Sequence, residues 1–256
     1  MSAVVAVVNQ KGGVGKTTVT LGLASAAAAA NRRTLVVDLD PQASSTWVLG
    51  LDPQSVEMST SELLQVARAG WARDAVQPSS WGPCVDIIPA SSRLQQRESL
   101  GPNAVGRLAK ALDGLHDDYD LVLIDCAPSL GNLARNALAA ASHALVVTEP
   151  SSLGLRGIGA VADFIDDVWE GYNPNLELLG VVVNRVPPVS GEADRQYDEL
   201  NRTVGKRAVW KPVVPQRVVL GQAIAERMPI HSYGSRASDV IAVFDQLYAK
   251  LRRTVR

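Results

Sequence analysis

The chain has 256 residues, 46% of them apolar, and a net charge of −1, which suits a single α/β domain spanning residues 1–256 with a substantial core. Its two cysteines, Cys84 and Cys126, are too few for a disulfide framework and favour a reducing cytoplasm. No apolar run approaches the roughly twenty residues that cross a bilayer, and no basic segment precedes the apolar start Ala3–Val8, so we expect neither a membrane span nor a signal peptide.

Apolar, β-branched runs alternate with segments of helical periodicity along the chain. Strands are expected at Val4–Val8, Thr34–Val37, Val85–Ile88, Leu121–Ile124, Ala144–Val147 and Leu178–Val183. Their near-continuous apolar character indicates burial on both faces of a mainly parallel sheet. Helices are expected at Lys16–Ala30, Ser59–Ala69, Ala104–Leu115, Leu130–Ala141, Leu155–Glu170, Glu192–Val204 and Ser235–Arg253. This alternation predicts a doubly wound α/β fold, in which ligands bind at the carboxyl ends of the strands.

A glycine-rich loop follows the first expected strand and precedes the first expected helix. Such a loop lets backbone N–H groups approach phosphates closely, and the positive end of the next helix faces them. Lys16 is predicted to reach the β- and γ-phosphates of a nucleotide, and the Thr17 hydroxyl to ligate Mg²⁺. The predicted phosphate-binding residues are Lys11, Gly12, Gly13, Val14, Gly15, Lys16, Thr17 and Thr18.

The loop departs from the usual P-loop pattern, because Gln10 stands where that pattern requires glycine. The sequence Lys-Gly-Gly-x-Gly-Lys-Thr-Thr instead resembles the deviant phosphate loop of the ParA/MinD/Soj class of P-loop ATPases. In that class Lys11 would be the signature lysine, which crosses to the nucleotide held by a partner subunit. There a second ammonium group would stabilise negative charge during phosphoryl transfer. The resemblance therefore implies bound ATP and Mg²⁺, a homodimer in the ATP-bound state, and catalytic roles for Lys11 and Lys16.

Two carboxylates, Asp38 and Asp40, end the second expected strand and face the same side of it. Neighbouring acids repel unless a cation or a water network lies between them. The segment Val36–Gln42 resembles the Asp-x-Asp-Pro-Gln element of the class, although Ala43 stands where the class usually has glycine. By that resemblance Asp40 holds the water network around Mg²⁺ and positions the attacking water, and Asp38 is the second carboxylate near that water.

A third acid ends the expected strand Leu121–Ile124. An apolar strand that ends in Asp125 has the Walker B form, in which the carboxylate binds Mg²⁺ beside Thr17. The metal-site prediction is therefore Thr17, Asp40 and Asp125. The class commonly continues Cys-Pro-Pro-Ser, and this chain has Cys-Ala-Pro-Ser.

Polar residues after the expected strand Leu178–Val183 are candidates for contacts to the base and to DNA. The resemblance places Asn184 on the adenine base and Pro215 beside it, although an asparagine at a strand end is also a common turn former. Residues 181–256 hold 13 basic and 7 acidic residues, against 12 and 19 in the rest, which suits an anionic partner such as DNA or an ordinary solvated face. The DNA candidates are Arg185, Arg195, Lys206, Arg207 and Arg217. Any one of them taken singly fits a hydrated surface better, so DNA binding would rest on phosphate contacts summed over several of them.

The last expected helix has an apolar stripe followed by Lys250, Arg252 and Arg253. MinD proteins end in a basic amphipathic helix that binds membrane, whereas a core helix has the same stripe and favours basic residues at its C-terminus. We expect packing on the sheet, so a membrane is not an expected partner. The paired cluster cysteines of a redox ATPase such as nitrogenase iron protein are absent from the sequence.

Together these motifs imply a ParA-like ATPase located in the cytoplasm and associated with the nucleoid. Its ATP-bound dimer would bind DNA non-specifically, and a ParB-like or other activating partner would stimulate hydrolysis. The output would be segregation or positioning of a chromosome region, a plasmid or another cargo. A MinD-like membrane-associated positioning ATPase is the alternative.

Overall fold

The computed structural model describes residues 3–255, apart from the side chains of His116, Leu153, Leu155 and Arg156. These residues form seven strands in one sheet, in the order β3-β4-β2-β5-β1-β6-β7. The strands are β1 (Ala3–Val8), β2 (Thr34–Leu39), β3 (Gln77–Pro78), β4 (Val85–Ile88), β5 (Leu121–Cys126), β6 (His143–Thr148) and β7 (Glu177–Val183). All pair in parallel except the short edge strand β3, which is antiparallel to β4.

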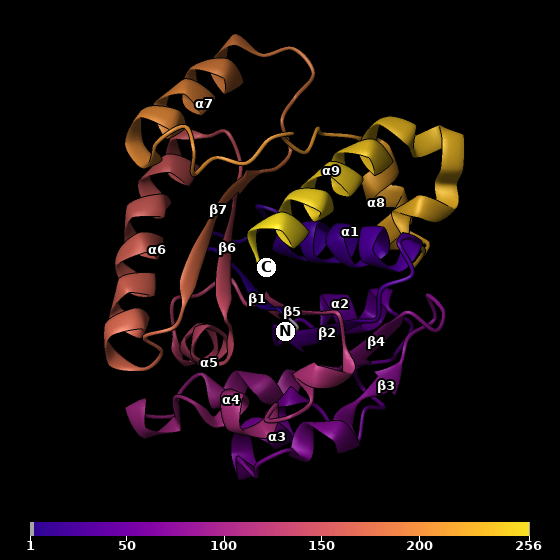
Figure 1. The fold of residues 1–256 in the computed structure, drawn as a ribbon, viewed down its shortest axis with the longest axis vertical. Coiled ribbons are helices and arrows are strands. Elements are labelled where there is room, and N and C mark those ends of the chain that lie inside the picture. The colour runs from indigo at the N-terminus through magenta and orange to yellow at the C-terminus, as the bar shows by residue number, and fades with distance from the viewer. Residues whose placement is uncertain (1–2, 256) are drawn as a thin grey trace.

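Helices cover both faces of this sheet (Figure 1). The α-helices are α1 (Lys16–Ala29), α2 (Ser44–Val48), α3 (Thr60–Val66), α4 (Arg107–Ala111), α5 (Asn132–Ala140), α6 (Ser152–Gly171), α7 (Gly191–Val204), α8 (Val218–Ala225) and α9 (Ser238–Thr254). Short 3₁₀ segments are η1 (Trp71–Ala75), η2 (Ser92–Arg97), η3 (Pro102–Ala104), η4 (His116–Asp118) and η5 (Ile230–Ala237). Helices α3 to α7 pack on one face, and α1, α2, α8 and α9 on the other. The predicted doubly wound, mainly parallel α/β fold is therefore confirmed.

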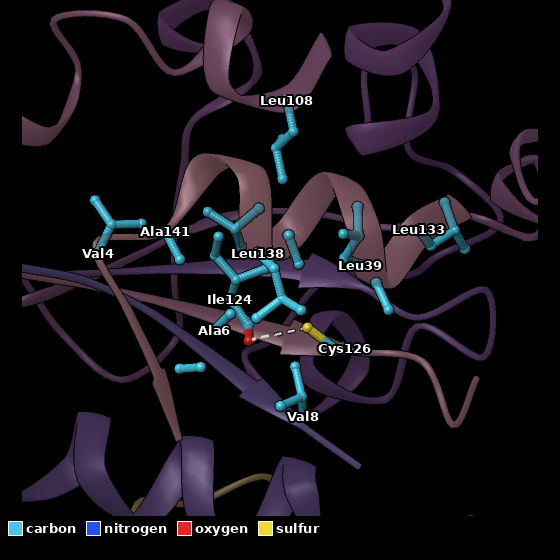
Figure 2. Packing of buried hydrophobic residues seen from close by; sticks show 14 of the residues in the cluster. Val4, Ala6, Val8, Leu39, Leu108, Ile124, Cys126, Leu133, Leu138 and Ala141 are labelled. Atoms are coloured by element: carbon cyan, nitrogen blue, oxygen red, sulfur yellow. Dashed lines mark hydrogen bonds between the residues drawn. The ribbon is translucent and has the colours of Figure 1, made fainter. Parts of the chain in front are cut away.

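Strand residues contribute alternately to the two cores. Along β1, Val4, Ala6 and Val8 face α5 and its neighbours, whereas Val5 and Val7 face α1 and α9, as the two-residue period of a strand requires. Figure 2 shows the first of these cores, where side chains of β1, β2 and β5 meet Leu133 and Leu138 of α5. Both faces of the strands are buried, which explains their near-continuous apolar sequence.

The expected helix Ala104–Leu115 is wrong in extent. Only Arg107–Ala111 is α-helical, and η3 precedes it. Gly106 has a φ of 89° and Gly114 a φ of 70°, so the chain turns in the left-handed region at both ends of the helix. Helices α2 and α8 and strand β3 were not expected, because segments this short have no clear period in the sequence.

Helix α9 packs on α1 through its apolar stripe. Val240, Phe244, Leu247 and Leu251 are fully buried, and a Cβ at Gly22 of α1 would overlap the ring of Phe244. The expected packing of this helix on the body of the protein is observed. Within the residues described, no helix has the length and apolarity needed to cross a membrane.

Candidate active site

The loop between β1 and α1 has the backbone form of a phosphate-binding loop. Gly13 and Gly15 have φ angles of 80° and 90°, in the left-handed region that glycine adopts without strain. A Cβ at Gly15 would also overlap the side-chain amide of Asn184. Helix α1 starts at Lys16 without a side-chain cap on its first N–H groups among the described residues. These N–H groups and the helix dipole are therefore free to face an anion.

Lys16, the first residue of α1, is buried. Its side chain is folded back along the loop, where Nζ donates to the carbonyls of Asn9 at 3.2 Å and Lys11 at 3.4 Å. Burial lowers the pKa of Lys16, and the nearby carboxylates of Asp125 and Asp40 oppose that shift. A buried ammonium among carbonyls and acids suits binding of a strongly anionic group.

Asp125 connects the phosphate loop to α2. It is fully buried at the end of β5 and accepts hydrogen bonds from Thr17 Oγ1 at 2.8 Å and Ser45 Oγ at 2.7 Å. Burial raises the pKa of Asp125 to about 6, although the two hydrogen bonds oppose this shift. Thr17 and Asp125, two of the predicted metal ligands, are therefore in direct contact.

Asp38 and Asp40 have different surroundings. Asp38 lies opposite Asp125 in the register of β2 and β5 and is fully buried. It accepts from Thr46 N at 2.8 Å, Thr46 Oγ1 at 2.7 Å and Asp40 N at 3.1 Å. Burial, followed by the charge of Asp125, raises the pKa of Asp38 to about 8.

Asp40 is half-buried, and its carboxylate accepts from Gln42 N at 2.9 Å. Burial raises its pKa, and the Gln42 N–H and the charge of Lys16 lower it. Asp40 therefore lies in the field of the phosphate-loop lysine, and its role at Mg²⁺ and the attacking water stays a prediction. Asp38 instead holds the first turn of α2, and its role near an attacking water stays a prediction.

Lys11, the predicted signature lysine, is held within its own chain. Its Nζ forms an ion pair with Glu149 and a hydrogen bond to Ser151 Oγ at 3.4 Å. Its backbone N–H donates to Asn9 Oδ1 at 2.9 Å. The two side chains of the ion pair are 31% and 24% exposed, so the pair lies at the surface. Contact of Lys11 with a second subunit would require this ion pair to open.

Asn184 and Pro215 line one pocket beside the phosphate loop. Asn184 Nδ2 donates to the carbonyl of Val14 at 2.8 Å, and its Oδ1 is buried without a hydrogen-bond partner among the described residues. The pocket has a volume of about 510 Å³ and is also lined by Thr18, Arg185, Gln216 and Gly221, a size in the range of small-molecule sites. An unpaired buried acceptor beside a phosphate loop fits the amino group of adenine.

The predicted DNA residues do not form one cluster. Arg185 and Arg217 lie at the rim of the base pocket, and Arg217 Nε bonds to Asp239 at 2.8 Å. Arg195 lies on α7, paired with Glu192 at 2.6 Å. Lys206 and Arg207 are exposed in the turn after α7.

Several site residues were not foreseen from the sequence. Ser45 and Thr46 bind the two buried acids, Glu149 and Ser151 bind Lys11, and Glu98 contacts the loop after Asp125. The Ser-Ser-Thr run shortly after Asp-Pro-Gln could have indicated Ser45 and Thr46, because hydroxyl residues are common at the start of helices.

Comparison with known proteins identifies the class. A family model described as an AAA domain matches residues 2–178. The chain is 34% identical over 233 residues to the chromosome partitioning protein ParA of Myxococcus xanthus, covering 90% of this chain and 81% of that protein. It is 31% identical over 240 residues to the sporulation initiation inhibitor protein Soj of Bacillus subtilis, covering 93% of each. The chain spans 63% of the length of two Mycobacterium tuberculosis proteins with which it is 37% identical over 214 residues, 82% of this chain.

Solved structures agree in fold. Cobyrinic acid a,c-diamide synthase from Mycobacterium smegmatis, with a bound ATP analog and magnesium, matches with a TM-score of 0.78 and 33% identity over 89% of this chain and 92% of that one. Apo McdA of Cyanothece matches with a TM-score of 0.88 over 98% of this chain and all of that one, and at 20% identity this likeness shows the fold alone. The fold and the loop define a P-loop nucleotide-binding protein. The chain belongs to the family described as an AAA domain and to the ParA/MinD superfamily that includes its ParA and Soj relatives.

Proposed function

We propose that this chain is a Mg²⁺-dependent partitioning or positioning ATPase that converts ATP and water to ADP and phosphate. The observation that carries the proposal is the convergence of three features at one edge of the sheet. These are the uncapped start of α1 with buried Lys16, the Thr17–Asp125 contact, and the base pocket with its unpaired Asn184 Oδ1. The Mycobacterium smegmatis neighbour, solved with an ATP analog and magnesium, supports the same ligands here.

The proposal assigns a role to each group of residues in the site. Lys16 and the N–H groups of residues 11–18 bind the phosphates, and Asn184 accepts from the adenine amino group. Thr17, Asp125 and Asp40 hold Mg²⁺, which would neutralise charge on the phosphate oxygens. Asp40 orients the attacking water, with Asp38 as the second carboxylate beside it. Lys11 leaves Glu149 and stabilises the phosphoryl group held by a second copy of the chain.

The output follows from the relatives named ParA and Soj. The ATP-bound dimer binds DNA non-specifically through Arg185, Arg195, Lys206, Arg207 and Arg217, and thereby associates with the nucleoid. A ParB-like partner stimulates hydrolysis, and the dimer then releases DNA and its cargo. Binding through phosphate contacts predicts an ATP-dependent DNA affinity that falls steeply between two salt concentrations. An affinity that ignores both ATP and salt would contradict this part of the proposal.

Burial of the apolar stripe of α9 argues against the membrane-associated alternative. Val240, Phe244 and Leu251 face α1 and the sheet, so a membrane-binding helix would first have to leave the core. Binding to anionic vesicles that needs both ATP and residues 240–256 would favour that alternative instead.

The phosphate-loop assignment is tested by nucleotide affinity. Lys16→Ala removes a charge-assisted contact of about 1.5–3 kcal/mol, so the Kd for a fluorescent ATP analogue should rise by roughly 10- to 100-fold. Lys110→Ala is the matched control, because Lys110 is an exposed lysine on α4, and its Kd should equal that of the wild type. Wild-type affinity in Lys16→Ala would refute the assignment.

A further inference from the structure

Glu98 joins the segment after η2 to the loop that follows Asp125. One carboxylate oxygen, Oε1, accepts from Ser129 Oγ at 2.7 Å, and the other, Oε2, accepts from Leu133 N at 2.9 Å. Beside it, Asn132 Nδ2 donates to the carbonyl of Arg97 at 2.9 Å. Three hydrogen bonds therefore tie residues 97 and 98 to the turn at residues 129–133.

The Glu98 carboxylate caps α5 from outside the helix. The N-cap position of α5 is Gly131, which has no side chain to accept from the first N–H groups. Glu98 supplies both an acceptor and a negative charge at the positive end of the helix. The approach depends on glycine, because a Cβ at Gly131 would overlap Glu98 Oε1.

The loop that Glu98 holds borders the proposed catalytic groups. It continues directly from Asp125 at the end of β5, and a Cβ at Gly12 of the phosphate loop would lie 3.7 Å from Pro128 Cβ. Glu98, Asp40, Gln42 and Pro128 line a single hollow of about 240 Å³. The position of this loop therefore sets the shape of the space beside Asp40.

The residue before Glu98, Arg97, is bound to α3, which lies on the same face of the sheet as α5 (Figure 1). Arg97 donates to Ser61 Oγ at 3.2 Å and to Gln65 Oε1 at 2.7 Å. At the start of α3, Thr60 Oγ1 donates to the carbonyl of Asp38 at 2.9 Å. Arg97 and Glu98 together thus connect the loop after Asp125, by way of α3, to the strand that carries Asp38.

We propose that Glu98 is a positioning residue for ATP hydrolysis, which fixes the 127–131 loop relative to Asp40 and the phosphate loop. The inference rests on the proposed ATPase function. Lys16, Thr17 and Asn184, the proposed nucleotide-binding groups, make none of their hydrogen bonds with Glu98. A displaced loop should therefore change the rate of hydrolysis and leave nucleotide affinity unchanged. Misplacement by about 1 Å costs up to 100-fold in rate at enzyme sites.

The test compares steady-state phosphate release with the Kd for a fluorescent ATP analogue in Glu98→Ala, Glu98→Gln and Ser129→Ala. We expect kcat of Glu98→Ala to fall by roughly 10- to 100-fold, with Kd within twofold of the wild type. Glu98→Gln should recover most of the lost rate, because its carbonyl still accepts from the Leu133 N–H. Ser129→Ala, which keeps the bond to α5, should lose less. Glu170→Ala, at an exposed position on α6, is the charge-matched control and should behave as the wild type.

The outcomes separate the two claims. An active wild type with unchanged kcat in Glu98→Ala overturns the inference and leaves the proposed function standing. A fall in kcat that Glu98→Gln does not relieve, or a Kd that rises in proportion, shows a general loss of structure and overturns it as well. If Glu98→Ala does not fold, Glu98→Gln and Ser129→Ala decide, and wild-type kcat in Ser129→Ala overturns the inference. A wild type that releases no phosphate overturns both claims.

Discussion

Substitution of Glu149 by glutamine should strengthen the ATP-dependent association of two copies of this chain. Glu149 and Ser151 hold Lys11 within its own subunit, and the proposed function requires Lys11 to reach the nucleotide of the other. The ion pair therefore competes with dimer formation. Glutamine keeps the size of the side chain and one acceptor oxygen, and removes the charge that attracts Lys11.

The expected size follows from the exposure of the pair. The side chains are 31% and 24% exposed, so the pair is weaker than a buried one and its worth is about 1 kcal/mol. Two copies of the pair open when one dimer forms. Loss of the Glu149 charge from both subunits should therefore stabilise the dimer by about 2 kcal/mol. This lowers the dimer Kd by up to ~30-fold, since 1.4 kcal/mol corresponds to about tenfold.

Sedimentation velocity with a slowly hydrolysed ATP analogue measures this Kd. Glu192→Gln is the matched control, because it removes the charge from an exposed ion pair with Arg195 on α7, and it should leave the dimer Kd unchanged. Lys11→Ala should bind nucleotide and remain monomeric. An unchanged or weaker dimer in Glu149→Gln would refute the competition that we infer.

Three further results are expected. The pKa of Asp38 is about 8 in the folded chain and about 4 in the unfolded chain. The contribution of Asp38 to the free energy of unfolding is therefore fully present below pH 4 and is lost as the pH rises through 8. Without nucleotide and Mg²⁺, the free energy of unfolding measured by urea titration should fall across this range, and Asp38→Asn should flatten the slope. An equal slope in both proteins would contradict burial of a neutral Asp38. Asn184→Ala should raise the Kd for ATP about 3- to 10-fold more than the Kd for inorganic tripolyphosphate, because the loss of the bond to the Val14 carbonyl affects both ligands and the loss of the base contact affects only ATP. Equal changes for both would exclude a role on the base. Gly22→Ala should overpack the contact with Phe244 and lower the free energy of unfolding by about 1–3 kcal/mol, and the control Gly157→Ala, where a Cβ meets nothing within 4 Å, should not.

Residues at strand ends were predictable from the sequence. Parallel strands end at the same edge of a sheet, so the acids Asp38 and Asp125 were expected to lie at the edge that carries the phosphate loop, with Asp125 beside Thr17. The register places Asp38 opposite Asp125. The position of each acid was predictable because it directly follows an apolar run, which predicts a buried strand, and the parallel topology then brings the ends of these strands together.

Contacts between distant loops were not predictable. Lys11 and Glu149 are 138 residues apart in the chain, and no period or motif in the sequence links them. Glu98 lies in a segment of short 3₁₀ turns with no helical or strand period, so its bonds to Ser129 and Leu133 depend on how α3 and α5 pack. These contacts are set by tertiary packing, which a local sequence pattern does not encode.

Phosphate release from Mg·ATP, measured as a rate per subunit across a range of protein concentrations, tests the central claim most directly. A dimeric ATPase that uses Lys11 across its interface predicts a rate per subunit that rises with concentration to a plateau. The same rate should be lost in Lys11→Ala while ATP binding is retained. A rate per subunit that does not depend on concentration, together with an active Lys11→Ala, would contradict the account.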